Sequence, residues 1–544
     1  MYEEIFRLNA SGDAKSPDRR WLEQLWVLGL LLAAILLYQM NLGDLPLRDW
    51  DEGIVAQVAR EILRSDTHWL YPTLDGEPYF NKPPLVHALI ALAYSIGGVN
   101  EWTARLPGAM LCALSVPLLY GIGRELFPLR GPAIFAALVY LTLLPVVRHG
   151  RLAMLDGAVQ CFFLLMLWCL LRSRRDLRYG LGVGIGLGLL SLTKGLVILP
   201  LVSIAIIFAL WDTPRLLASG YIWSGLLLGM APAVAWYAAQ WHHYGFAFIS
   251  AHFLSQSWDR ILSPVDQNSG PPWYYLLEIL KYAWPWLLFW PYGLRLAWEN
   301  RILGWGKLIL VWTGVYLLVI SVMSTKLPWY VLPVYPAVAL ACGAWLAQVW
   351  LGSDTYSVSP LNPALRRRLY PRFGVAVLAL LAVAGWASSV YFGFFAHAGR
   401  ALPVTLVAVA LTMTVSGFLF YRQDRQFILI LFWGMYVSLS LFVSSPSWVW
   451  ELGEDYPVMP VAAMIQRQVP PDEAVLTDYP NHRPSLNFYS DRRVIAGATP
   501  EQIQRYWEEN PQPYLLLQEK AISELNLKHS KQVAAAGGWI LVTR

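Results

Sequence analysis

Apolar segments of about 20 residues recur along most of this chain, and they constrain its fold more than any other feature. Segments of this length that enter hydrocarbon must be helical, because a helix satisfies its own backbone hydrogen bonds. The composition agrees, since 56% of the 544 residues are hydrophobic and 14% are charged. We predict thirteen spans, at residues 21–41, 103–123, 132–147, 157–172, 179–193, 195–211, 221–241, 282–298, 307–323, 328–349, 373–394, 402–421 and 427–444.

One further apolar segment, Pro83 to Gly97, decides the topology. Counted as a span it would place ten arginines outside, which contradicts the bias of basic residues towards the cytoplasm. These are Arg172, Arg174, Arg175, Arg178, Arg366, Arg367, Arg368, Arg372, Arg422 and Arg425. We therefore interpret the segment as an interfacial helix and place the N-terminus in the cytoplasm, with the span from Trp21 to Met40 retained.

The predicted domains are a transmembrane domain at 1–444 and an external soluble domain at 445–544. The first external loop, 44–102, carries two interfacial helices, of which Glu52 to Leu63 has an apolar stripe suited to a membrane surface. In the C-terminal part, strand-like runs at Ala474–Thr477, Tyr514–Gln518 and Trp539–Thr543 flank a helical pattern at Pro500–Glu509. This pattern predicts a small α/β domain. The four cysteines lie in apolar runs, which indicates neither disulfides nor a zinc site.

Polar residues that could carry chemistry cluster in three places on the predicted external side. The first cluster is Asp49-Trp50-Asp51-Glu52. Capping of the following helix is an equally good interpretation of its acids. The functional interpretation is that a carboxylate at the bilayer boundary acts as a general base towards a hydroxyl acceptor.

The second cluster, Tyr79-Phe80-Asn81-Lys82-Pro83-Pro84, holds a lysine beside a rigid turn. Such a cation can contact lipid headgroups, or it can neutralise a phosphate leaving group. The third cluster contains Arg148, Arg151 and Asp156. Its arginines either anchor a helix end or bind an anion, and external arginines run against the inside bias. Further external candidates are His252, Arg260 and Lys326. Asp259 is more simply interpreted as a solvated charge. The position of Lys194 at a short turn indicates a structural or lipid-contact role.

Seven motifs occur in order along the chain: Asp51-Glu52, Gly76 to Pro84, Glu101 to Pro107, Gly150 to Asp156, Leu192 to Gly195, Lys326 to Pro333 and His482 to Leu486. Together they resemble the bacterial dolichyl-phosphate-mannose–protein-mannosyltransferase-like family, in the branch that includes the lipid A aminoarabinose transferase. The resemblance covers nearly the whole chain. Two motifs depart from that branch. It usually continues the Asp-Glu pair with Ala-Arg-Tyr, where this chain reads Gly53-Ile54-Val55, and it usually has an acid where this chain has Asn81.

The resemblance implies the architecture of a C-type membrane glycosyltransferase and an inverting transfer of a sugar from a polyprenyl-phosphate, usually undecaprenyl phosphate. It implies Asp51 as the catalytic base with Glu52 beside it, Asp156 as the second acid, and Lys82 on the carrier phosphate. Arg260 and Lys326 would help to bind the carrier, and no metal or other cofactor is expected. The expected partners are the donor, membrane lipids and an envelope acceptor of unknown class, with no nucleic acid, and the protein is expected to be a monomer of the bacterial inner membrane.

Two other functions fit a polytopic protein. A lipid or solute transporter would also carry embedded charges, but transporters tend to show internal repeats and midplane sites. A metal-dependent oligosaccharyltransferase would need converging carboxylates and usually a larger soluble domain. Charges gathered on one face favour the transferase.

Overall fold

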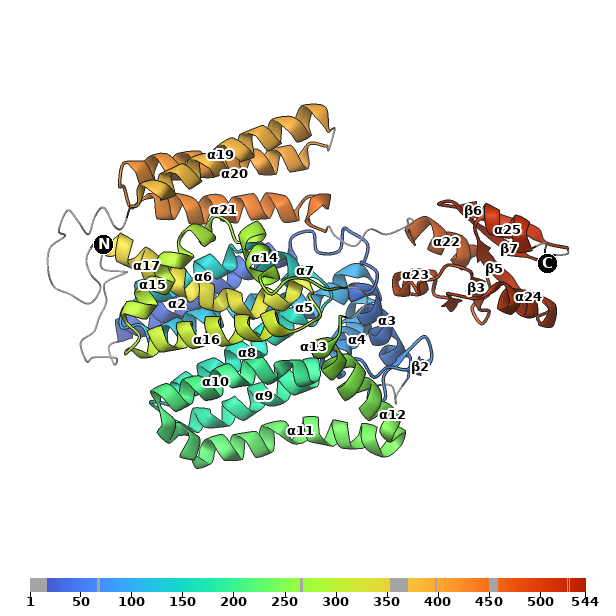
Figure 1. Ribbon diagram of the computed structural model, residues 1–544, viewed down its shortest axis with the longest axis horizontal. Helices are drawn as coiled ribbons and strands as arrows, with labels where there is room; N and C mark the ends of the chain where they lie inside the picture. The colour runs from blue at the N-terminus through green and yellow to red at the C-terminus, as the bar shows by residue number, and fades with distance from the viewer. Residues whose placement is uncertain are drawn as a thin grey trace. The chain divides into compact units, whose positions relative to one another are not determined.

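The computed structural model describes residues 17–65, 69–264, 268–352, 370–396, 399–449, 458–525, 527 and 529–544. The chain divides into two compact units, whose elements are labelled in Figure 1. Unit 1 comprises Met1–Leu42, Phe80–Leu85 and Gly108–Val449. Unit 2 comprises Gly43–Tyr79, Val86–Pro107 and Trp450–Arg544.

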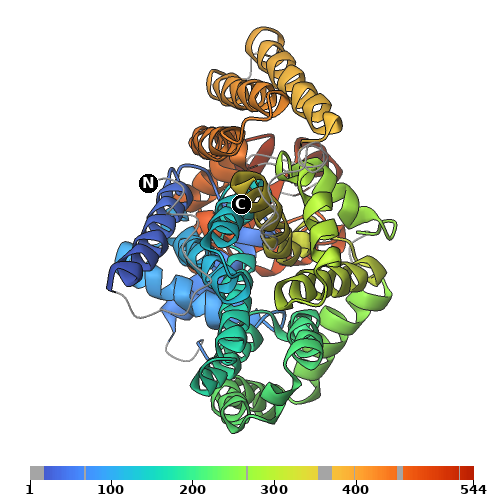
Figure 2. The same ribbon diagram turned by 90° about the vertical axis from the view of Figure 1, so that its left-hand side faces the viewer.

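Unit 1 is a helical bundle, and Figure 2 shows many of its helices nearly end-on. Its main helices are α2 (Pro17–Gln39), most of α5 (Glu101–Leu126), α6 (Arg130–Leu141), α7 (Leu144–Arg151), α8 (Asp156–Arg172), α9 (Gly180–Lys194), α10 (Leu199–Asp212), α11 (Gly220–Tyr244), α14 (Tyr274–Tyr282), α15 (Trp290–Glu299), α16 (Gly304–Val322), α17 (Tyr335–Leu351), α19 (Arg372–Val390), α20 (Ala401–Tyr421) and α21 (Phe427–Val443). Short helices connect some of them: α12 (Phe246–Ile249), the π-helix η4 (Ser250–Trp258), α13 (Asp259–Leu262) and the 3₁₀ segment η6 (Pro328–Val334).

The chain is a polytopic helical membrane protein by the length and composition of its helices. Within the described residues, seven helices are long and apolar enough to cross a membrane, or eight if the bent pair α6 and α7 forms one span. The pair bends by 57° at its break. Helices α8, α9, α10 and α21 coincide with predicted spans but have only 14–17 residues. The count of thirteen spans therefore stays a prediction.

One predicted span, 282–298, is not a continuous helix. Helix α14 ends at Tyr282 and α15 begins only at Trp290, with the 3₁₀ turn η5 (Trp286–Leu288) between them. Pro285 and Pro291 each lack the N–H that would continue a helical ladder, which explains the break. The hydrophobicity of the segment predicted a span but not the interruption of its helix.

Close helix packing holds the bundle together. Helix α17 lies at its centre, because every residue of the apolar window in Pro328–Leu351 is buried inside the protein. Helices α9 and α11 touch backbone to backbone, so that a Cβ atom added at Gly184 would lie 1.9 Å from the Gly225 carbonyl oxygen. Small residues permit this approach in membrane helices, where dispersion contacts replace the hydrophobic effect.

Unit 2 contains a five-stranded mixed sheet in the order β4-β3-β5-β7-β6. Its strands are β3 (Val475–Thr477), β4 (Val494–Ile495), β5 (Tyr514–Leu517), β6 (Lys531–Ala536) and β7 (Trp539–Thr543). Strands β4, β3 and β5 are parallel, whereas β7 is antiparallel to both β5 and β6. Helices α22 (Val458–Gln468) and α23 (Pro484–Ser490) pack on one face, and α24 (Pro500–Glu509) and α25 (Glu519–Leu525) pack on the other. The predicted α/β character of this region is confirmed, with its three predicted strands and its predicted helix.

The first loop belongs to the same unit as this sheet. It contains α3 (Asp51–Arg64), the two-stranded hairpin β1 (Thr73–Leu74) and β2 (Glu77–Pro78), and α4 (Leu85–Gly97). The apolar stripe of α3 packs inside the unit, where Val58 and Ile62 contact Tyr79 and Ala91. The stripe is therefore a protein-packing surface, and this corrects the interpretation that it faces a membrane. The interfacial placement of α4 and the predicted domain boundary at 444/445 stay predictions.

Candidate active site

An ion pair between Asp156 and Lys194 is the centre of the candidate site in unit 1. The Lys194 Nζ donates to Asp156 Oδ1 at 2.7 Å, and the two side chains are only 10% and 8% exposed. Asp156 is the first residue of α8 and Lys194 is the last residue of α9. Each charge therefore sits at the helix end whose dipole favours it. The ion pair holds the two helix ends together, and each charge compensates the other where both side chains are mostly buried.

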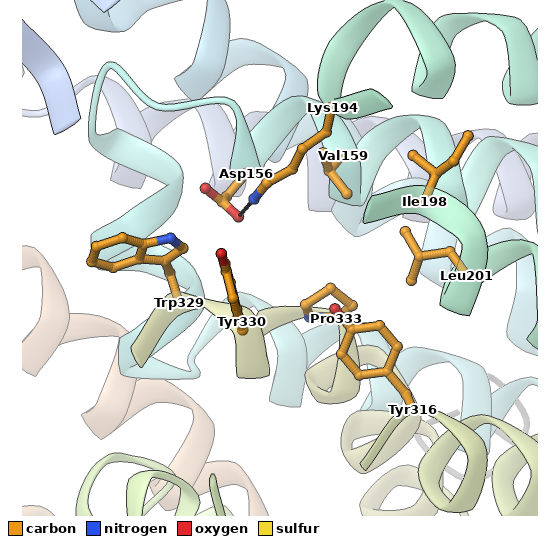
Figure 3. Close-up of a pocket in the computed structure, with 9 residues that line it drawn as sticks. All are labelled: Asp156, Val159, Lys194, Ile198, Leu201, Tyr316, Trp329, Tyr330 and Pro333. Carbon is orange, nitrogen blue, oxygen red and sulfur yellow. Dashed lines mark hydrogen bonds and ion pairs between the residues drawn. The ribbon is translucent and has the colours of Figure 1, made fainter. Parts of the chain in front are cut away.

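This pair lines a small pocket (Figure 3). Ile198 and Leu201 form an apolar wall of the pocket. Tyr330 lies across from them, and its hydroxyl points towards the ion pair. The Lys194 ammonium lies 5.8 Å from the centre of the Tyr330 ring, within the range of a cation–π contact. The pocket thus has a charged end and an apolar wall.

His252 joins this region to the segment that carries Lys82. Its Nδ1 pairs with the Phe80 carbonyl oxygen at 2.7 Å, and its Nε2 lies 3.3 Å from the Tyr237 hydroxyl. The Gly195 backbone packs against the same ring, because a Cβ atom there would lie 2.8 Å from His252 Nε2. Gly195 also has φ +59°, which favours glycine. The imidazole therefore brings the segment before Lys82 next to the turn after Lys194.

His252 is neutral in this environment. Burial lowers the pKa of its imidazole to about 4, the charge of Lys82 adds to that effect, and the hydrogen bond to the Phe80 carbonyl opposes it. Only 2% of the residue is exposed. A neutral imidazole can hold the Phe80 carbonyl as an Nδ1–H donor without placing a second positive charge beside Lys82.

The two arginines of the third cluster, Arg148 and Arg151, donate hydrogen bonds to backbone carbonyls. Arg151 donates to the Leu37 and Tyr38 oxygens at 3.0 and 3.1 Å, at the C-terminal end of α2, and stacks 4.4 Å from the Trp448 ring. The Arg148 Nε donates to the Trp448 oxygen at 3.1 Å. Both contacts tie helix ends together, which supports a structural role; their predicted contact with substrate stays a prediction.

The structure describes the side chain of Lys326 but not that of Arg260. The Lys326 Nζ donates to the Ile320 and Ser321 carbonyls at 2.9 and 2.7 Å, where it caps the end of α16. It also lies 5.3 Å from the Tyr275 ring. Arg260 lies in the short helix α13, and its side chain is outside the described part of the chain. A carrier contact by either residue stays a prediction.

Asp51 is the first residue of α3 in unit 2, and the backbone before it is strained. Trp50 has φ 60° and ψ −64°, and the Asp51 N–H donates to the Asp49 carbonyl at 2.6 Å. This is a γ-turn with positive φ, a conformation that costs a tryptophan about 1–3 kcal/mol. Such a conformation persists only where the surrounding contacts enforce it.

Glu52 is fully buried and forms a two-pronged ion pair with Arg105. The distances are 2.8 Å from Arg105 Nε to Glu52 Oε1 and 2.9 Å from Nη2 to Oε2. Arg105 also donates to the Leu45 and Pro46 carbonyls, and the Arg48 N–H donates to Glu52. Glu52 therefore organises the loop, a role that its position beside Asp51 did not reveal. Tyr79, another predicted site residue, lies 6% exposed in the apolar cluster under α3.

The sequence and the fold of this chain are similar to those of known proteins. Residues 81–238 match the dolichyl-phosphate-mannose-protein mannosyltransferase family. An undecaprenyl phosphate-α-4-amino-4-deoxy-L-arabinose arabinosyl transferase of Pseudomonas aeruginosa is 30% identical over 376 residues, which cover 66% of this chain and 65% of that protein. Residues 81–238 of this chain are therefore similar to that family. The resemblance predicted from the motifs is confirmed.

Further relatives agree with this relationship. Arabinosyl transferase 1 of Pseudomonas fluorescens is 29% identical over 333 residues, which span 58% of this chain and 59% of that relative. The crystal structure of ArnT from Cupriavidus metallidurans bound to undecaprenyl phosphate aligns with a TM-score of 0.76 at 19% identity, covering 95% of this chain and 98% of that one. This likeness shows a shared fold with the mannosyltransferase-like enzymes.

Sequence reasoning missed two groups of residues in this mannosyltransferase-like chain. Lys194 was assigned a structural or lipid-contact role apart from Asp156, although both lie in motifs of the family. The partner of Glu52, Arg105, lies in the Glu101–Pro107 motif, and no role was assigned to it. In both cases the ordered motifs were the available signal, because the sequence does not say which helix ends meet. Across the described residues no group of three or more His, Cys, Asp or Glu could hold a metal ion.

Proposed function

We propose that this protein is a membrane glycosyltransferase that moves a sugar from a polyprenyl-phosphate carrier, most simply undecaprenyl phosphate, to an acceptor of the bacterial envelope. The observation that carries the proposal is the ion pair of Asp156 and Lys194, which brings two of the resembled family's motifs together beside an apolar pocket wall. Lys82 belongs to the segment that His252 holds next to the same region. The relationship to arabinosyl transferases that use an undecaprenyl-phosphate donor supports the same chemistry.

The reaction is an inverting displacement at the anomeric carbon. The acceptor hydroxyl attacks this carbon while its proton passes to Asp51, and the bond to the carrier phosphate breaks. Lys82 neutralises the charge that grows on the departing phosphate. Asp156 is the second acid of the site and is paired with Lys194.

The topology that we propose has thirteen spans, a cytoplasmic N-terminus and an external active site in the inner membrane. The shorter helices α8, α9, α10 and α21 complete the spans. The donor sugar remains a class, because Gly53-Ile54-Val55 and Asn81 differ from the residues usual in the aminoarabinose branch. The apolar Ile54 and Val55 stand where that branch usually has Arg and Tyr, and the neutral Asn81 stands where it usually has an acid.

Purified protein in liposomes, supplied with carrier lipid that bears a radiolabelled sugar and with an envelope extract, tests this proposal. We expect the label to leave the carrier and appear on a new product, without added Mg²⁺ or Mn²⁺. Intact carrier that has only changed its side of the bilayer would indicate a transporter instead. Turnover that requires added metal would indicate a metal-dependent oligosaccharyltransferase mechanism.

A further inference from the structure

The C-terminal helix α23 is fastened to the first loop at both of its ends, within unit 2. At one end the Ser485 N–H donates to Asp49 Oδ1 at 3.0 Å, the Ser485 hydroxyl donates to the same oxygen, and the Arg483 Nε donates to Asp49 Oδ2. At the other end Arg60 of α3 donates to the Phe488 and Asn487 carbonyls at 2.7 and 3.2 Å. Residues more than 400 positions apart therefore meet at the loop that carries Asp51.

Asp49 connects helix α23 to the backbone of the first loop. It is 2% exposed, and its carboxylate accepts both the Arg483 guanidinium and two donors of Ser485. Its own carbonyl closes the γ-turn by accepting the Asp51 N–H at 2.6 Å. The carboxylate and the carbonyl of one residue thus connect α23 to the turn that sets where α3 begins.

Helices α23 and α3 pack without free space between them at Gly53 and Ser485. A Cβ atom at Gly53 would lie 2.7 Å from the Ser485 nitrogen and 3.2 Å from its Cα. The first turn of α3 is therefore in direct backbone contact with the first turn of α23. A shift of α23 has to move the start of α3, where Asp51 lies.

We propose that Arg483 and Ser485 are positioning residues for Asp51, acting through Asp49 and the strained Trp50 turn, so that the C-terminal part of the chain completes the catalytic loop. This inference rests on the proposed role of Asp51 as the general base. A base must lie within hydrogen-bond reach of the acceptor proton, and a displacement of about 1 Å can cost about 100-fold in rate. The motif His482 to Leu486, which the proposed reaction did not use, acquires a function in this way.

Three variants and one matched control test the proposal in the labelled-carrier assay. We expect Arg483→Gln to lower kcat by about 10-fold or more and to leave KM for the carrier within about twofold, because the base is displaced while the phosphate contacts remain. Arg483→Lys keeps a cation for Asp49 and recovers part of the rate. Ser485→Ala removes one of the donors and gives a smaller loss of kcat. The control is Arg493→Gln, which breaks the exposed pair of Arg493 with Glu77 between the same two segments and leaves the Asp49 contact intact.

Two further measurements separate positioning from mere stability. The melting midpoint of Arg483→Gln should stay well above the assay temperature, so that its loss of kcat does not come from unfolded protein. Hydrogen exchange of the backbone amides at 49–53 should be faster in Arg483→Gln than in the wild type and unchanged in Arg493→Gln. If Arg483→Gln does not fold, the same comparison with Ser485→Ala decides.

The proposal is overturned if Arg483→Gln or Ser485→Ala keeps wild-type kcat and amide exchange, if their loss lies in KM alone, or if Arg493→Gln loses as much. Failure of the proposed function looks different, because the wild-type protein itself would then transfer no sugar. Amide exchange reports the tether to the Asp51 loop independently of turnover.

Discussion

Lys82 is the residue through which the proposed reaction meets the carrier phosphate. We predict that Lys82→Ala weakens carrier binding and slows transfer together by about 10- to 100-fold, because phosphate is present in both the ground and the transition state and a hydrogen bond to a charged group contributes about 1.5–3 kcal/mol. Carrier affinity by titration and initial rates measure the two effects. Lys520→Ala, at a lysine side chain that is 86% exposed on α25, is the matched control and should change neither. Unchanged carrier affinity in Lys82→Ala would remove Lys82 from the phosphate site.

His252 gives the protein a predicted sensitivity to acid. Its folded pKa of about 4 lies below the ordinary value of 6.5, so the unfolded chain binds a proton between these values while the folded protein does not. The stability that His252 contributes is therefore full above about pH 6.5 and is lost as the pH falls towards 4, by about 3 kcal/mol in total. Melting midpoints of purified wild type and His252→Gln between pH 7 and 4.5 measure this. The wild-type midpoint should fall more steeply, and parallel curves would contradict the assignment.

The sequence predicted which residues belong to the candidate site better than it predicted which hydrogen-bond and ion-pair partners they have. Asp156 and Lys194 both lie in motifs, yet their ion pair depends on how the start of α8 meets the end of α9. Arg148 and Arg151 were interpreted either as helix-end anchors or as anion ligands, and in the structure they donate to backbone carbonyls. Every residue carries a carbonyl, so an arginine that caps a distant helix end leaves no pattern in the sequence.

At the scale of elements, the start of α3 depends on a glycine. We predict that Gly53→Ala lowers the melting midpoint and slows transfer, because its Cβ would lie 2.7 Å from the Ser485 nitrogen and such overpacking costs about 1–3 kcal/mol. Gly29→Ala in α2 is the control, since a Cβ atom there meets nothing within 4 Å. A Gly53→Ala protein as stable and active as Gly29→Ala would show that α23 can move away from α3 without consequence.

Elements whose own residues carry a strand or helix pattern were predictable, and elements that depend on distant partners were not. The strands at Val475–Thr477, Tyr514–Leu517 and Trp539–Thr543 and the helix at Pro500–Glu509 lie where the sequence predicted them. Helix α23 has seven residues and was not predicted, because its stability comes from Asp49 and Arg60 rather than from its own pattern. The apolar stripe of α3 identified the helix correctly, but amphipathicity alone does not distinguish a membrane surface from a protein core.

At the scale of the whole molecule, the first loop and the C-terminal sheet share unit 2, and we infer from this that they lie on one side of the membrane. We predict that this side is external. The native cysteines of the described chain are buried, so single cysteines can report sidedness. In intact cells, Glu77→Cys and Lys520→Cys, at side chains 76% and 86% exposed, should react with an impermeant maleimide. Arg175→Cys, at a side chain 65% exposed, should react only after permeabilisation. Labelling of Arg175→Cys from outside would contradict the thirteen-span topology.

Turnover of Asp51→Asn tests most directly the claim that this protein is a transferase with Asp51 as its base. The amide keeps the shape of the carboxylate and cannot accept the acceptor proton, so only the chemical step should suffer. In the labelled-carrier assay we predict that Asp51→Asn binds the carrier lipid with near wild-type affinity, melts near the wild-type temperature and transfers no measurable sugar. An Asp51→Asn protein that retained most of the wild-type transfer rate would contradict the account.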